Sequence, residues 1–252
     1  MKAVMFDFDG TITKENGNVW RDAWDKLGYY TGHDSLYKCL YYEFMKGNIN
    51  HDEWCDLTCK RFRQKGLTGE MFMNIAGDIE LMPGASETFK KLYDEGYSLH
   101  IVSGNFKSVI EKTLGDNVKY FDNISANDMY FDSNGVISAI KGTEYDFDGK
   151  ALYIERFRKA TDSNSDEIIF VGNGDNDEWA HLSGCKTICL NPDENVEKEN
   201  STKWHKVMED VTDLTDILPV IDNMIVSDKS KETSKKEYVV PSMRIAEEEA
   251  VL

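Results

Sequence analysis

The sequence predicts an α/β fold, in which helices cover both faces of a parallel sheet and a small helical domain is inserted after the first strand. Through most of the chain, short apolar runs of strand length alternate with segments of helical character. One block, residues 14–80, differs because it is rich in Trp and Tyr and contains no strand signal. We therefore expect a core domain from residues 1–13 and 81–225, the helical insert at 14–80, and a charged tail at 226–252.

The first strand and the insert are marked by local signals. An apolar run predicts a buried strand at residues 2–6. Glycines near helix ends and the capping residues Asn50 and Thr68 divide the insert into helices. These helices are expected near residues 18–27, 34–46, 51–66 and 69–76.

The remaining elements follow in alternation. Pro83 and Gly96 bracket one helix, and the segment 132–135 (Asp-Ser-Asn-Gly) predicts a hairpin turn. We expect helices at 84–95, 106–113, 150–160 and 214–225, with a short helix after residue 177. The expected strands are 97–102, 121–126, 129–131, 136–140, 167–171 and 186–190.

Composition excludes several classes of function. The 252 residues carry 29 basic and 46 acidic side chains, a net charge of −17, and no basic stripe that would bind nucleic acid. No apolar run has the ~18 residues of a membrane span. Five cysteines and a strand that begins directly after Met1 favour a reduced, cytoplasmic protein, expected as a monomer or homodimer.

Polar turns containing glycine follow the strands at one edge of the predicted sheet, where open α/β sheets bind ligands. They are Asp7-Phe8-Asp9-Gly10-Thr11, Ser103-Gly104-Asn105, Asp148-Gly149-Lys150 and Gly172-Asn173-Gly174-Asp175-Asn176-Asp177. The third is a junction between a loop and a helix. We expect these four turns to meet and form one site.

The residue types in these turns suit phosphate chemistry with a metal. Of Asp7 and Asp9, one carboxylate can attack and bind a metal while the other transfers a proton. Asn173 and Asp177 offer the hard oxygen ligands that Mg²⁺ prefers. Ser103 and Lys150 can bind phosphate oxygens, and glycines such as Gly104 let backbone amides approach an anion.

Three local signals also have a simpler interpretation beside the functional one. Asp9-Gly10 resembles a hairpin turn, but a poor second strand follows it. The segment 173–184 resembles the start of a calcium loop, but Glu178 and Gly184 occupy the positions that require Gly and Glu. Cys55 and Cys59 share a helical face without a second cysteine pair, which favours a structural role over zinc.

The four motifs in this order resemble the haloacid dehalogenase superfamily of phosphotransferases, and the segment 102–106 (Val-Ser-Gly-Asn-Phe) resembles its phosphoserine phosphatase branch. The resemblance covers about residues 1–220. It implies a Rossmann-like core, a helical cap that closes over the substrate, and a Mg²⁺ cofactor. It also implies that Asp7 is the nucleophile that forms an aspartyl-phosphate, and that Asp9 transfers protons.

The resemblance assigns the other site residues as well. It places Mg²⁺ on Asp7, on the backbone carbonyl of Asp9 and on the fourth motif, where Asn173 and Asp177 are the candidates. The residues it places around the phosphate are Thr11, Ser103, Gly104, Asn105 and Lys150. The family usually has Asp at the position of Asn173, and its phosphoserine branch often has Glu near Asn16. Trp20 and Arg21 are the best candidates in the insert for contact with the substrate.

These observations favour a Mg²⁺-dependent phosphatase that hydrolyses a small phosphorylated metabolite. A sugar-phosphate mutase or other phosphotransferase with related motifs is the alternative enzyme. A non-catalytic phosphate-binding module is a further alternative, which the amide at Asn173 favours. A metal site of the glycosyltransferase Asp-x-Asp type is expected in the middle of a chain, whereas this pair of acids ends the first strand.

Overall fold

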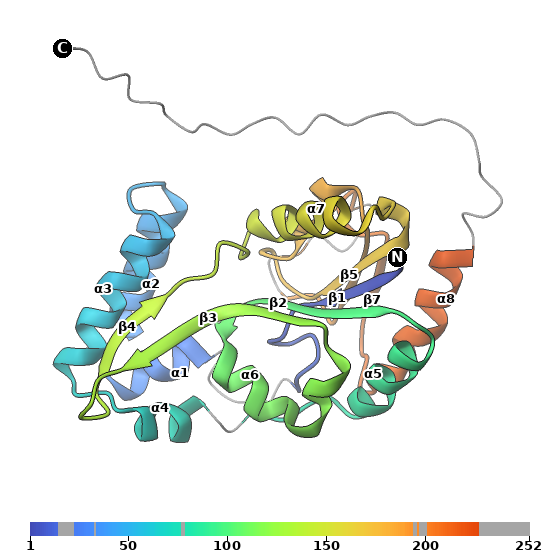
Figure 1. Cartoon of the computed structure of the whole chain (residues 1–252). Coiled ribbons are helices and arrows are strands. Elements are labelled where there is room, and N and C mark those ends of the chain that lie inside the picture. The colour runs from blue at the N-terminus through green and yellow to red at the C-terminus, as the bar shows by residue number, and fades with distance from the viewer. Residues whose placement is uncertain (15–22, 33, 77–78, 194–195, 197–200, 227–252) are drawn as a thin grey trace, which may run out of the picture.

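A seven-stranded sheet organises the structure, which is a computed structural model that describes residues 1–14, 23–32, 34–76, 79–193, 196 and 201–226 (Figure 1). The strand order is β4-β3-β2-β1-β5-β6-β7, and every neighbouring pair except β3 and β4 is parallel. The strands are β1 (Ala3–Phe6), β2 (Ser98–Phe106), β3 (Asn123–Phe131), β4 (Ile137–Lys141), β5 (Ile168–Gly172), β6 (Lys186–Leu190) and β7 (Lys206–Met208). This arrangement confirms the predicted α/β class.

Some helices pack on the two faces of this sheet, and others form the insert. The insert contains α1 (Ala23–Tyr30), α2 (Asp34–Met45), α3 (His51–Gln64) and α4 (Gly69–Ala76). The remaining helices are α5 (Ala85–Asp94), α6 (Lys107–Leu114), α7 (Gly149–Thr161) and α8 (Leu218–Val226), and the short 3₁₀ helices are η1 (Gly115–Tyr120), η2 (Ser165–Glu167), η3 (Glu178–Ser183) and η4 (Leu214–Ile217). Among the described helices none is long and apolar enough to cross a membrane.

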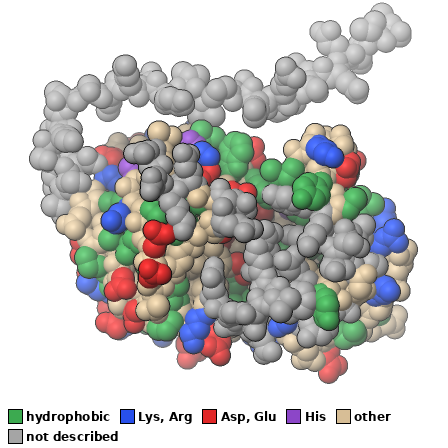
Figure 2. Space-filling view, turned by 180° about the vertical axis from the view of Figure 1, so that it is seen from behind, with side chains coloured by type: hydrophobic (Ala, Val, Ile, Leu, Met, Phe, Trp, Pro, Cys, Tyr) green, Lys and Arg blue, Asp and Glu red, His purple; other side chains and the backbone are tan. Residues whose placement is uncertain are grey.

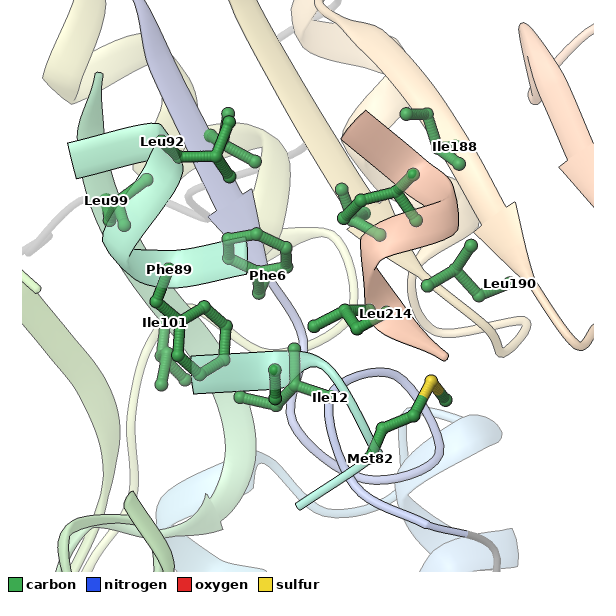
Figure 3. Packing of buried hydrophobic residues seen from close by; sticks show 14 of the residues in the cluster. Phe6, Ile12, Met82, Phe89, Leu92, Leu99, Ile101, Ile188, Leu190 and Leu214 are labelled. Atoms are coloured by element: carbon green, nitrogen blue, oxygen red, sulfur yellow. The ribbon is translucent and has the colours of Figure 1, made fainter. Parts of the chain in front are cut away.

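The central strand β1 is buried on both faces, since successive side chains of a strand point to opposite sides. Val4 and Phe6 pack with residues of α5, α6 and α8, and Phe6 makes an edge-to-face contact with Phe89 at 5.8 Å between ring centroids (Figure 3). Ala3 and Met5 pack on the other face with residues of α7. This double burial holds the end of β1 rigidly in the middle of the sheet.

The insert is joined to the core by two segments that lie side by side. Thr13 and Leu81 form an antiparallel bridge, and Lys14 pairs with Glu80 at 2.8 Å. A second apolar cluster connects the insert to the β3–β4 hairpin, and it includes Phe62, Phe72 and Ile137. The hairpin therefore packs with the insert, although the sequence placed it in the core. The division of the chain into domains stays a prediction.

Local predictions within the insert agree with the structure. Asn50 caps α3 through a reciprocal pair of hydrogen bonds with Glu53, at 2.9 and 2.8 Å. Thr68 accepts a hydrogen bond from the backbone of Met71 in the first turn of α4. Burial raises the pKa of the Cys55 thiol to about 12, which suits the structural role predicted for this cysteine.

Five expectations differ from the structure. The first insert helix, expected to end at residue 27, continues through Gly28 to Tyr30, because a helix tolerates a single glycine at modest cost. Strand β2 continues to Phe106 instead of ending before Ser103, because the apolar Phe106 rejoins β3 after an irregular segment. The two strands expected at 121–126 and 129–131 are one strand, β3, whose second half pairs with β4. The segment expected as a helix at 214–225 begins as 3₁₀ helix η4. The edge strand β7 was missed, because three residues carry no periodicity.

The surface and the ends of the chain complete the description. On the face seen in Figure 2, the described basic side chains are scattered among acidic ones. The start of the first insert helix and the tail at 227–252 lie outside the described residues, as do Asn16, Trp20 and Arg21.

Candidate active site

The predicted site residues meet at the carboxyl ends of three neighbouring strands. Strand β1 pairs with β2 on one side and with β5 on the other. The backbone of Asp7 extends this pairing, because its N–H donates to the carbonyl of Val171 at 2.9 Å. The first, second and fourth motifs therefore lie next to each other, as the order of polar turns predicted.

Two buried carboxylates face one buried ammonium at the centre of the site. Lys150, in the first turn of α7, donates from Nζ to Oδ1 of Asp7 at 3.0 Å and also to Oδ1 of Asp177. Lys150 and Asp177 have no solvent exposure, and Asp7 is 5% exposed. Three charges are thus held out of water, which is costly unless they are paired.

Burial and the neighbouring charges both affect the ionisation of Asp7 and Lys150. Burial, and next the charge of Asp177, raises the pKa of Asp7 to about 7, although Lys150 acts in the opposite direction. Burial lowers the pKa of Lys150, but the charges of Asp177 and Asp7 outweigh it, so the ammonium stays protonated. One positive charge therefore does not balance the two acids.

The fourth motif holds Asp177 through the backbone. Its Oδ2 accepts from the N–H groups of Asn173 and Gly174, at 2.9 and 3.0 Å. A Cβ atom at position 172 would lie 2.4 Å from Cγ of Asp177, so the glycine there is required by close approach. Thr11 donates its hydroxyl to Oδ1 of Asn173 at 3.3 Å, which ties the first motif to the fourth.

Asn105 positions the second acid of the first motif. Its Nδ2 donates to both carboxylate oxygens of Asp9, at 3.0 and 2.8 Å. Its Oδ1 accepts from the backbone N–H of Phe106, which fixes the amide from the other end. The contact with Asp9 was not foreseen, since the resemblance assigned Asn105 to the phosphate.

The oxygen donors of this site suit a divalent cation. Asp7 and Asp177 supply carboxylates, and Asn173 supplies an amide oxygen, all of the type that Mg²⁺ prefers. Burial, and next the charge of Asp177, raises the pKa of Asp7, and a bound cation would favour the ionised form of this carboxyl. Within the described part of the chain, no group of three His, Cys, Asp or Glu side chains is arranged to hold a metal. A cation here would therefore need amide or backbone oxygens as well.

Three residues at the edge of the site were not predicted. Asp146 lies over Gly104, where an added Cβ would be 2.3 Å from Oδ2 of Asp146. Asn127 and Trp24 each donate a hydrogen bond to the backbone carbonyl of Gly104. Only Asp146 carried a signal in the sequence, since it is an acid four residues before Lys150, in the turn that leads into α7.

Comparison with known proteins identifies the family. A family model described as haloacid dehalogenase-like hydrolase matches residues 1–180. Phosphoserine phosphatases of Archaeoglobus fulgidus and Methanocaldococcus jannaschii are each 26% identical over 179 residues, or 70% of this chain. The matches span 48% and 79% of those two relatives.

Solved structures show the same fold. A substrate-bound phosphoserine phosphatase complex superposes with a TM-score of 0.67, at 24% identity, over 87% of this chain and 98% of that one. A phospho-aspartyl intermediate analogue of phosphoserine phosphatase gives a TM-score of 0.64, with the same identity and coverage. The chain therefore belongs to the haloacid dehalogenase-like hydrolases, and within that family it is similar to phosphoserine phosphatases.

Proposed function

We propose that this hydrolase is a Mg²⁺-dependent phosphatase that cleaves a small phosphomonoester through an aspartyl-phosphate on Asp7. The observation that supports it best is the buried Asp7 carboxylate at the end of the central strand, bound by Lys150. A second acid, Asp9, lies two residues further along and is oriented by Asn105. A nucleophile beside a fixed cation and an oriented acid is the arrangement that phosphoryl transfer needs.

In the first step, a carboxylate oxygen of Asp7 forms a bond to phosphorus while the bond from phosphorus to the alcohol oxygen breaks. Lys150 favours the ionised, nucleophilic form of Asp7 and holds the plane of its carboxylate through Oδ1. Asp9 gives a proton to the departing alcohol oxygen. The product of this step is an acyl phosphate on Asp7 and a free alcohol.

In the second step, water attacks the phosphorus of the aspartyl-phosphate, and Asp9 takes the proton of that water. The bond between phosphorus and the Asp7 oxygen breaks, which releases inorganic phosphate and regenerates the carboxylate. The two donor contacts from Asn105 keep the Asp9 carboxylate in one orientation through both proton transfers.

The cofactor proposed for this site is Mg²⁺, held by Asp7 and Asp177 together with Asn173 and the backbone carbonyl of Asp9. When bound, it would draw charge from the transferring phosphoryl group and offset the excess of negative charge at the two acids. The groups proposed to surround the phosphate are Thr11, Ser103, Gly104, Asn105 and Lys150.

The proposed substrate is a small phosphorylated metabolite, and the similarity to phosphoserine phosphatases makes phosphoserine the first compound to test. Sugar phosphates follow, because a mutase would return an isomerised sugar phosphate in place of inorganic phosphate. A location in the cytoplasm and a monomeric or homodimeric state stay predictions.

The test is release of phosphate from p-nitrophenyl phosphate and a panel of phosphorylated metabolites, with Mg²⁺ or with EDTA. We expect activity with Mg²⁺ only, and a loss of at least about 10³-fold in kcat for Asp7→Asn. The matched control is Asp94→Asn, which makes the same change in an exposed ion pair on α5. Undiminished turnover by the Asp7 variant would rule out the proposed nucleophile.

A further inference from the structure

The segment that carries Ser103, Gly104 and Asn105 lies at an irregular step in the pairing of β2 with β3. On β2, Val102 lies opposite Ser125 of β3, and Phe106 lies opposite Asn127. Four steps along β2 thus correspond to two steps along β3, so two residues are left out of the register. An irregularity of this kind interrupts the ladder and leaves backbone groups to find other partners.

Two side chains supply those partners at the Gly104 carbonyl. Trp24 donates from Nε1 at 2.8 Å, and Asn127 donates from Nδ2 at 2.5 Å. Asn127 is 1% exposed, and its Oδ1 accepts from the backbone N–H of Thr143 at 2.7 Å. This amide therefore links the second motif to the segment that leads into Lys150.

Trp24 differs from Asn127 because it belongs to the insert and not to the sheet. It lies on α1, and its ring packs against Phe106 with 4.3 Å between ring centroids. The same indole thus makes an apolar contact and a directed hydrogen bond at the second motif. Of the two donors to the Gly104 carbonyl, one is therefore a residue that only a docked insert can provide.

The planar peptide bond transmits this orientation to the site. The Gly104 carbonyl and the Asn105 N–H belong to one rigid trans unit and point in opposite directions. That N–H donates to Oγ of Ser103 at 3.2 Å, so the carbonyl contact also sets the Ser103 hydroxyl. The next residue along, Asn105, orients Asp9.

We propose that Trp24 is a positioning residue, whose indole N–H acts with the Asn127 amide to hold the Gly104–Asn105 peptide in its phosphate-binding orientation and so couples docking of the insert to phosphate binding. The inference rests on the proposed function, because Ser103 and Gly104 are taken as phosphate ligands. The structural part of the inference is the hydrogen bond from Trp24 to Gly104, and this bond can be tested separately from catalysis.

Trp24→Phe is the sharpest variant, since it removes the N–H donor while it keeps an aromatic ring against Phe106. Loss of one hydrogen bond corresponds to a change of about fivefold to tenfold in an equilibrium constant. We expect both KM for p-nitrophenyl phosphate and the inhibition constant of inorganic phosphate to rise by that factor. In the full-length protein, hydrogen exchange of a peptide covering residues 102–107 should accelerate to a similar extent.

The matched control is Trp204→Phe. Trp204 is 6% exposed, packs against Cys189, and its Nε1 has no hydrogen-bond acceptor among the described residues. The same chemical change there should leave the KM, the inhibition constant and the exchange of residues 102–107 as in the wild type.

A merely structural role for Trp24 would lower the thermal midpoint and the active fraction while KM and phosphate inhibition stay constant, and that result would overturn the proposal. Wild-type exchange rates at residues 102–107 in Trp24→Phe would overturn it too. If the wild type hydrolyses no phosphomonoester, the proposed function fails. The exchange experiment and calorimetry with inorganic phosphate then still decide whether Trp24 orders this segment.

Discussion

Asp7→Asn is expected to stabilise the metal-free protein at pH 8, although it removes the proposed nucleophile. The folded state raises the pKa of Asp7 from 3.8 to about 7, chiefly through burial and the charge of Asp177. A shift of that size corresponds to about 4 kcal/mol. Asn resembles the protonated form of Asp in shape and keeps an oxygen for Lys150, so we expect most of this cost to disappear.

The difference in stability between Asp7→Asn and the wild type should grow as the pH rises. Between pH 3.8 and 7 the folded protein holds the Asp7 proton more tightly than the unfolded chain does, so the wild type loses stability as the pH rises. Asn at this position does not titrate. The advantage of the variant should therefore shrink by about 2–3 kcal/mol between pH 8 and pH 5.

Urea unfolding in EDTA, followed by tryptophan fluorescence, measures the difference in unfolding free energy between Asp7→Asn and the wild type. Added Mg²⁺ should narrow the gap at pH 8, because it stabilises the wild type by about 2.7 kcal/mol at one hundred times its dissociation constant. The exposed substitution Asp94→Asn should show no such dependence on pH. A variant less stable than the wild type at pH 8, or an equal difference at both pH values, would refute this account of the buried charges.

Three further outcomes follow from other contacts. Asn105→Ala removes both donors to Asp9 and should lower kcat about 10- to 100-fold in a steady-state assay at saturating Mg²⁺, with wild-type kcat contradicting the orienting role. Burial lowers the pKa of His100 from 6.5 to about 4, so the folded protein favours the neutral imidazole. The stability that depends on this neutral form is fully present above pH 6.5. About 3 kcal/mol of that stability should be lost as the pH falls from 6.5 to 4, and His100→Asn should flatten the unfolding free energy over this range. Phe6→Ala should cost about 3–5 kcal/mol in urea unfolding, because the fully buried ring leaves a cavity; a loss under about 1 kcal/mol would contradict its place in the core.

Sequence patterns were sufficient for the class of fold and for the turns that come together at the candidate site. The alternation of apolar strands with helices predicted the sheet, and the capping residue Asn50 marked the beginning of α3. Both are local effects, because periodicity and capping depend on residues a few positions apart. The meeting of four polar turns was also predictable, since parallel strands end at a common edge.

The contacts that orient the site depend on the tertiary structure. The irregular step in β2 depends on pairing with β3, and the partners of the Gly104 carbonyl are 80 and 23 residues away in the chain. Asn105 is 96 residues from Asp9, so no spacing rule connects them. The motifs specify which chemical groups reach the site. Their orientation, and the imbalance of charge around Lys150, arise only when distant segments pack together and exclude water.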